Sequence, residues 1–186
     1  MSGSLTFILG GARSGKSAFA QRLAMKGRQV LFVATAEAHD DDMARRIEAH
    51  RNDRPAEWDT LEEPVDLAES LKDAVAAYDT VVVDCLTLWV SNLLLKYEGE
   101  ADCEKRILAS ADGLLEVIAS SNANWIVVSN EVGLGIVPEY ALGRVYRDAL
   151  GRVNQRFAAR ADTVYFMVAG PALDLKALGA TPFMDA

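Results

Sequence analysis

The sequence predicts a single three-layer α/β domain built around a mostly parallel sheet, and two observations support this. Short, continuously apolar runs alternate along the chain with longer amphipathic stretches, and continuous hydrophobicity in short runs is typical of parallel strands buried on both faces. No repeat, low-complexity segment or proline-rich linker divides the 186 residues, which suffice for one hydrophobic core. We therefore expect residues 1–186 to form one domain, with ligands bound along the carboxyl ends of its strands.

The individual elements follow from these patterns in chain order. Strands are expected at Leu5–Leu9, Gln29–Ala34, Thr80–Asp84, Asn124–Ser129 and Asp162–Val168, with a weaker strand at Glu57–Leu61. Helices are expected near 17–26, 40–52, 64–78, 86–96, 103–121 and 139–160. Because these helices fall between the strands, they would supply right-handed crossovers.

Composition excludes several classes of protein. The chain has 27 acidic and 19 basic residues, a formal net charge of −8, which disfavours general binding to nucleic acid or to anionic membranes. No apolar run approaches the roughly 18 to 20 residues that span a bilayer. Cys85 and Cys103 are the two cysteines and form no C-x-x-C pair, so structural zinc and a disulfide are disfavoured. We expect a cytoplasmic protein.

A phosphate-binding loop follows the first strand. Its residues are Gly10, Gly11, Ala12, Arg13, Ser14, Gly15, Lys16 and Ser17. They fit the pattern of a glycine, four residues, then Gly-Lys followed by Ser or Thr, in which backbone N–H groups cradle phosphates. Lys16 would neutralise the β- and γ-phosphates, and the Ser17 hydroxyl would hold Mg²⁺. The alternative is a chance match on a glycine-rich turn, but the order of strand, loop and helix favours a nucleoside triphosphate site.

Two further strands end in polar residues. Thr80–Asp84 is an apolar strand that ends in a carboxylate, as expected for the acid that holds Mg²⁺ opposite a phosphate loop. The strand near Trp125–Ser129 ends in Asn130 and Glu131, before a segment with two glycines. These two residues fit either a loop that faces the substrate or a simple cap of the turn, and both interpretations stay open.

His50 is the second distinctive residue. Met43, Ile47 and His50 fall on one face of the expected helix, where a lone histidine is usually only packed. Four arginines surround it in sequence, namely Arg45, Arg46, Arg51 and Arg54. Because arginine pairs well with phosphate oxygens, a neutral His50 among them could act as a covalent nucleophile on phosphorus.

The stretch 139–160 carries a basic stripe. Arg152, Arg156 and Arg160 are four residues apart, with Arg144 and Arg147 before them. The stripe could bind phosphate, but a solvated or subunit-facing stripe paired with the surplus acidic residues is favoured. No Asn-Lys-x-Asp or Thr-Lys-x-Asp motif follows, which disfavours a regulatory GTPase.

Several short motifs in order resemble one family. They are Gly10 to Ser17, Ala34-Thr35-Ala36, Arg46 to Arg51, Arg54-Pro55, Trp58, Asn130 to Gly133 and Gly151 to Gln155. Over about residues 4 to 170 the chain resembles the bifunctional adenosylcobinamide kinase/adenosylcobinamide-phosphate guanylyltransferase of cobalamin biosynthesis. The C-terminal segment Pro171–Ala186 contains no motif that we can match to this family.

The resemblance implies a RecA-like P-loop fold, commonly trimeric, with Mg²⁺ as cofactor. It implies an enzyme that phosphorylates adenosylcobinamide with ATP or GTP and then transfers GMP from GTP onto that phosphate. His50 matches the histidine that becomes guanylylated in the family. The residues implied to contact nucleotide, besides the phosphate loop, are Ala34, Thr35, Ala36, Arg51, Asn52, Asp53, Arg54, Glu62 and Asp84.

Two other functions compete with this interpretation. One is a kinase for a different small molecule, in which His50 is only packed. The other is a nucleotide-dependent switch or binding protein with slow hydrolysis. Covalent labelling by GTP would test the first, and turnover of an acceptor would test the second.

Overall fold

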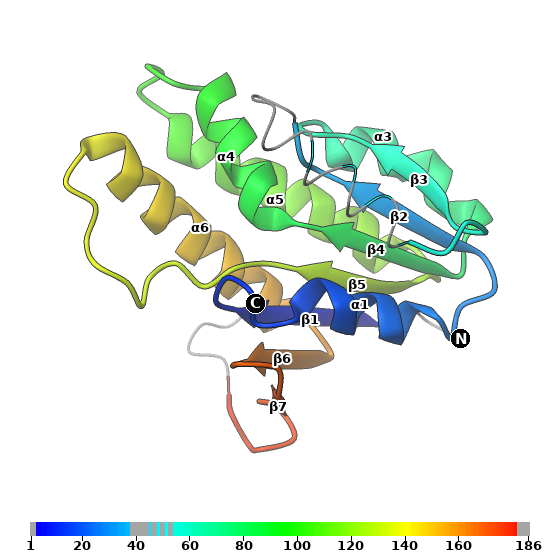
Figure 1. The fold of residues 1–186 in the computed structure, drawn as a ribbon. Helices are drawn as coiled ribbons and strands as arrows, with labels where there is room; N and C mark the ends of the chain where they lie inside the picture. The colour runs from blue at the N-terminus through cyan, green and yellow to red at the C-terminus, as the bar shows by residue number, and fades with distance from the viewer. Residues whose placement is uncertain (1–2, 38–44, 46–47, 49–50, 52–53, 182–186) are drawn as a thin grey trace.

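The computed structural model describes residues 3–37, 45, 48, 51 and 54–181 of the chain, and it has the predicted α/β architecture (Figure 1). A seven-stranded sheet has the order β3-β2-β4-β5-β1-β6-β7. The strands are β1 (Leu5–Gly10), β2 (Val30–Ala34), β3 (Asp59–Glu62), β4 (Thr80–Asp84), β5 (Asn124–Val128), β6 (Thr163–Met167) and β7 (Ala172–Asp174). All neighbouring strands are parallel except the antiparallel pair β6 and β7.

Helices cover both faces of this sheet. They are α1 (Lys16–Ala24), α3 (Leu67–Ala74) with the 3₁₀ turn η1 (Val75–Ala77), α4 (Leu86–Lys96), α5 (Cys103–Ser120) and α6 (Ala141–Arg160). The helix α1 packs on one face, as Figure 1 shows, and contributes Ala20 and Ala24 to a small apolar cluster. The larger core on the other face joins the sheet to α3, α4, α5 and α6. The predicted three layers are therefore confirmed.

Successive side chains of the central strands alternate between the two faces of the sheet, so one sheet contributes residues to both apolar cores. In β4, Val81 and Val83 belong to the larger core, whereas Val82 between them belongs to the smaller one. Side chains of successive strand residues point to opposite faces. All three valines are fully buried, which is the reason that this run has no polar positions.

The C-terminal edge differs from the expectation. The strand β7 lies within the segment that the sequence left unassigned, and it pairs antiparallel with β6. The chain reverses through Ala169 and Gly170, whose φ angles are 53° and 104°. A strand of three residues is too short to show a hydrophobic period, so only the pairing reveals it.

The other elements lie close to their predicted positions. The strand at Glu57–Leu61 forms as β3 over Asp59–Glu62, and α4 has its predicted bounds. The expected helix 40–52 falls mostly outside the described residues. Among the helices that the structure describes, none is both long and apolar enough to cross a bilayer.

Candidate functional site

The phosphate loop runs from the end of β1 to the start of α1. Gly10 packs against the backbone of β6, and a Cβ atom at this position would lie 2.4 Å from the carbonyl oxygen of Met167, so only glycine fits. Gly15 precedes the helix with a φ of 96°, a left-handed conformation that glycine adopts without strain. The two glycines therefore set the course of a loop that ends at a helix N-terminus, where anions bind.

The Lys16 side chain folds back onto the phosphate loop. The side chain is buried, and Nζ donates a hydrogen bond to the Gly11 carbonyl oxygen at 2.7 Å. Burial lowers the pKa of Lys16, while negative charge at Cys85 and Asp84 would oppose this shift. Burial also raises the pKa of the Cys85 thiol to about 11, so at neutral pH the opposing charge is that of Asp84. A buried ammonium group within the electrostatic reach of a carboxylate can exchange the carbonyl for a phosphate oxygen.

Ser14 supplies a further polar group to the loop. Its Oγ atom is buried and has no hydrogen-bond partner among the described residues. Gly170, from the turn before β7, donates to the Ser14 carbonyl oxygen at 3.1 Å. An unpartnered buried hydroxyl costs free energy, and a phosphate oxygen in the loop would satisfy it.

Strand register brings three of the implied nucleotide contacts into one row. Ala34 of β2 lies opposite Glu62 of β3 on one side and opposite Asp84 of β4 on the other. Asp84 in turn lies opposite Val128 of β5, which is the neighbour of the strand that carries the phosphate loop. The predicted site residues therefore converge at the carboxyl edge of the sheet, as ligand sites of such sheets do.

The Thr35 side chain, next to Ala34 in the sequence, bonds the backbone beside this row. The side chain is fully buried, and Oγ1 accepts a hydrogen bond from the Cys85 N–H at 2.8 Å and donates one to the Cys85 carbonyl oxygen at 2.7 Å. Asn92 of α4, also buried, donates to the carbonyl oxygens of Thr35 and Pro64. Thr35 thus ties the end of β2 to the residue after Asp84. Sequence reasoning missed Asn92, although a lone amide within the apolar run of α4 is a detectable signal.

Arg54 is the strongest anion-binding candidate outside the loop. Its guanidinium carbon lies 3.9 Å from the centroid of the Phe32 ring, and Phe32 in turn stacks on Trp58. The Nε and Nη1 atoms are buried without a hydrogen-bond partner among the described residues. Burial lowers the pKa of Arg54, and the negative charge of Asp84 opposes this effect. A guanidinium that is stacked near Asp84, with two nitrogens unpartnered among the described residues, is suited to bind phosphate.

The remaining segment around Arg54 is described in part. Arg51 forms an exposed ion pair with Glu62 of β3, so these two implied contact residues lie together. His50, Asn52 and Asp53 fall outside the described residues. Ala36 follows Thr35 at the edge of the sheet and is half-buried.

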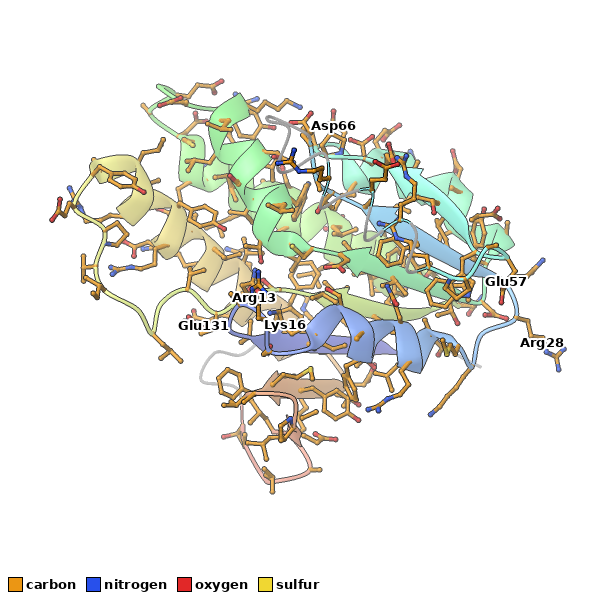
Figure 2. The ribbon with its side chains drawn as sticks, viewed as in Figure 1. Arg13, Lys16, Arg28, Glu57, Asp66 and Glu131 are labelled. Atoms are coloured by element: carbon orange, nitrogen blue, oxygen red, sulfur yellow. The ribbon has the colours of Figure 1, made fainter. Side chains whose placement is uncertain are left out.

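Both interpretations of the Asn130–Glu131 turn find support. Glu131 Oε1 accepts a hydrogen bond from the Gly133 N–H at 2.5 Å, which is the capping arrangement. The Glu131 N–H donates to the Gly10 carbonyl oxygen at 3.1 Å, which holds the turn against the phosphate loop. In Figure 2, Arg13, Lys16 and Glu131 lie close together near the start of α1. The turn therefore lies beside the loop even though its carboxylate bonds locally.

Three arginines of the basic stripe on α6 pair with acidic residues of the same chain. Arg152 forms an ion pair with Glu104, and Arg156 forms one with Asp112, both on α5. Arg147 pairs with Asp148 on its own helix. These ion pairs agree with the favoured interpretation, in which arginines of the stripe pair with the surplus acidic residues.

The donor set fits Mg²⁺ bound together with a nucleotide. Ser17 at the start of α1 and Asp84 offer one hydroxyl and one carboxylate, and both are half-buried. The described residues contain no group of three or more His, Cys, Asp or Glu side chains that could hold a metal. Mg²⁺ commonly takes one or two protein ligands and completes its shell with water and phosphate oxygens, which matches this pair.

Comparison with known proteins agrees with the geometry. The family model described as "Cobinamide kinase / cobinamide phosphate guanyltransferase" matches residues 6–175. The bifunctional adenosylcobalamin biosynthesis protein CobP of Pseudomonas aeruginosa is 48% identical over 170 residues, covering 91% of this chain and 95% of that protein. The bifunctional adenosylcobalamin biosynthesis protein CobU of Escherichia coli is 40% identical over 180 residues, covering 92% and 99% of the two chains.

A solved structure supports the fold at greater distance. A crystal structure of the RadB recombinase superposes with a TM-score of 0.52 at 18% identity, covering 94% of this chain and 81% of that one. This likeness shows the RecA-like fold alone. The family match, in contrast, spans the phosphate loop, the Asp84 row and the α6 motif. The chain therefore belongs to the cobinamide kinase / cobinamide phosphate guanyltransferase family, which confirms the resemblance and the expectation of an enzyme.

Proposed function

We propose that the enzyme phosphorylates the aminopropanol hydroxyl of adenosylcobinamide with ATP or GTP and then transfers GMP from GTP to the new phosphate. The products would be adenosylcobinamide-GDP and pyrophosphate. The observation that carries this proposal is the buried Lys16 inside a loop of phosphate-binding geometry, in a chain of this family.

In the kinase step, the chain's own groups would act mainly by positioning and electrostatics. Lys16 would leave the Gly11 carbonyl oxygen for the γ-phosphate, and the loop N–H groups would take other phosphate oxygens. Arg54, whose Nε and Nη1 atoms have no hydrogen-bond partner among the described residues, would add positive charge near Asp84. Ser17 and Asp84 would hold Mg²⁺, which when bound supplies charge neutralisation at the phosphates. Asp84 or Glu131 would orient the substrate hydroxyl.

In the second step, we infer a covalent guanylyl intermediate on His50. A neutral imidazole nitrogen would attack the α-phosphorus of GTP, forming a P–N bond as the bond to pyrophosphate breaks. A phosphate oxygen of the corrinoid would then attack the same phosphorus, which releases the histidine. Support comes from the arginines beside His50 in sequence, and from the position of Arg51 and Glu62 next to the Asp84 row.

We also propose that the enzyme is a homotrimer, with the corrinoid lying in a groove between subunits. The support is an apolar surface on the loop after β5 and on the first turns of α6. Its exposed side chains are Leu134, Ile136, Val137, Tyr140, Leu142 and Val145. Exposed apolar side chains gathered in one segment are typical of interaction sites, and so large a ligand needs more surface than one small subunit offers.

Labelling with GTP that carries ³²P at the α-phosphate tests the covalent step. We expect label on His50 after denaturation, in a phosphoramidate that survives base and is lost in acid. The His50→Ala and His50→Asn variants should lose both labelling and guanylyl transfer, because neither side chain offers an imidazole nitrogen. Both should keep much of the kinase activity, since Lys16, Ser17 and Asp84 are intact. Label at another residue, or parent-rate transfer by His50→Ala, would show that the covalent mechanism on His50 is wrong. Absence of any label and of guanylyl transfer in the parent would instead favour a kinase for a small molecule.

A further inference from the structure

Two motifs from distant parts of the chain meet inside the protein. One is the turn Ser129–Glu131 after β5, and the other is the segment Gly151–Gln155 on α6, which contains Asn154. Asn154 is 5% exposed, and its neighbours Val153 and Phe157 on α6 are fully buried in the larger core. A buried amide in such a helix face is costly unless all of its hydrogen bonds are made.

The Asn154 side chain bonds the turn with both ends of its amide. Ser129 Oγ donates to Asn154 Oδ1 at 2.7 Å, and Asn154 Nδ2 donates to the Asn130 carbonyl oxygen at 3.1 Å. Ser129 is fully buried, so water does not replace these bonds. A third bond, from the Asn130 N–H to Thr87 Oγ1 at 2.8 Å, joins the turn to the first turn of α4.

The same turn contacts the phosphate loop through its backbone. The Ser129 N–H donates to the Ile8 carbonyl oxygen at 2.9 Å, and the Glu131 N–H donates to the Gly10 carbonyl oxygen at 3.1 Å. Gly10 is the first residue of the loop, and Thr87 follows closely after Asp84. The turn therefore lies between the two parts of the nucleotide site, and Asn154 holds it from behind.

We propose that Asn154 is a positioning residue for the kinase step, acting through the Ser129–Glu131 turn on Gly10 and on Glu131. This rests on the proposed phosphate-binding role of Gly10–Ser17. Asn154 touches no reacting atom. Its amide fixes the position of the turn, and the turn fixes the Gly10 carbonyl group at the start of the phosphate loop. Small displacements of catalytic groups reduce turnover strongly, so the effect belongs to the catalytic step more than to nucleotide binding.

The test compares Asn154→Ala with Val153→Ala. Both remove buried atoms from the same helix turn, but Val153 makes no hydrogen bond to the Ser129–Glu131 turn through its side chain. With adenosylcobinamide and ATP, well below the unfolding temperatures, we expect kcat of Asn154→Ala to fall about 10- to 100-fold with less than about threefold change in nucleotide KM. We expect Val153→Ala to lower the melting temperature while kcat stays within about threefold of the parent.

A milder variant and a double-mutant cycle complete the test. Ser129→Ala removes one of the two bonds, so its kcat should fall in the same direction but less, and this variant decides the matter if Asn154→Ala does not fold. The double variant should lose less than the product of the single losses, because both act through one turn.

Equal kinetics of the Asn154 or Ser129 variant and the Val153 control would overturn the proposal. If Lys16→Met is at the same time inactive, only the role of Asn154 fails. If Lys16→Met keeps parent activity, the proposed role of the loop itself fails.

Discussion

Lys16 illustrates how a single residue is held ready for function at a cost to stability. Its ammonium group is buried against the Gly11 carbonyl oxygen, and burial lowers its pKa. Removing an ammonium group from water is unfavourable, and one carbonyl oxygen compensates for it only in part. The arrangement therefore weakens the fold, and a phosphate oxygen in the proposed nucleotide site would compensate the ammonium group more fully.

We predict that Lys16→Met abolishes most kinase activity without weakening the fold. Loss of one preorganised cation that binds the transferred phosphoryl group should reduce kcat/KM by about 10²- to 10³-fold or more. A pKa that is lowered in the folded state means that the unfolded state binds more protons, so this lysine destabilises the fold below its folded pKa, and that penalty fades as pH rises toward the unfolded value. At pH 7 the variant should thus unfold at the same or a higher temperature than the parent.

Thermal unfolding and phosphorylation assays check this prediction, with Lys26→Met as the matched control. Lys26 is exposed just after α1, so its replacement should leave the melting temperature and the phosphorylation rate unchanged. A Lys16→Met protein that unfolds at lower temperature, or that phosphorylates substrate at the parent rate, would contradict the assignment.

At the scale of elements, the start of α3 depends on a residue outside the helix. Asp66 at the N-cap position makes no side-chain cap bond. Instead, the Glu63 carboxylate accepts hydrogen bonds from the N–H groups of Val65 and Asp66 and from the Ser70 hydroxyl. Glu63 directly follows β3, so this carboxylate fixes how the chain passes from the edge of the sheet beside Glu62 into α3.

We predict that Glu63→Gln destabilises the protein in a pH-dependent way. Burial alone would raise the pKa of Glu63, but its hydrogen bonds outweigh burial and the pKa is lowered. A lowered carboxyl pKa stabilises the fold above the unfolded value of about 4.3, and this contribution is lost as pH falls through the folded pKa. The loss at pH 7 should resemble that of a helix cap, about 0.5 to 2 kcal/mol.

Urea unfolding at pH 7 and at successively lower pH measures this difference. The difference in free energy of unfolding between the parent and Glu63→Gln should become smaller as the carboxylate is protonated. Glu69→Gln, an exposed position in the first turn of the same helix, should lower the free energy of unfolding less than Glu63→Gln, because its charge acts only through the helix dipole. A difference for Glu63→Gln that stays constant with pH would show that the charge of the cap is unimportant.

At the scale of the whole molecule, the distribution of exposed apolar residues is uneven. Ile136 is 97% exposed and Leu134 is 81% exposed, on the loop that projects beyond β5 in Figure 1. The chain carries a net charge of −8, which keeps copies apart by repulsion. An apolar contact that buries this loop would offset that repulsion.

We predict a homotrimer that Ile136→Glu disrupts. Sedimentation at micromolar concentration should give about three times the 20.2 kDa chain mass for the parent. A charge placed on the apolar surface should shift the variant toward monomer, with its far-UV circular dichroism unchanged, since Ile136 is 97% exposed. A parent protein that sediments as a fully active monomer would exclude the trimer.

Sequence alone determined the features that depend on neighbouring residues. The apolar run at Thr80–Asp84, the glycine-lysine loop and the amphipathic period of α4 each record a local property of the chain, and each element formed where it was expected. The phosphate loop was predictable because its eight residues are contiguous, and Gly15 takes a left-handed conformation that glycine adopts without strain. The family resemblance added His50, whose role stays a prediction.

Only the tertiary structure decided what lies beside that loop. The row of Glu62, Ala34 and Asp84 depends on strand order, and the bonds of Asn92 and Asn154 join residues 24 to 57 positions apart. The short β7 exists only because β6 offers it an edge. Hydrophobic periodicity reports which face of an element is buried, but not which other element covers it. Contacts between distant segments arise from packing of the whole domain, so the buried amides that support the site became visible only in the folded chain.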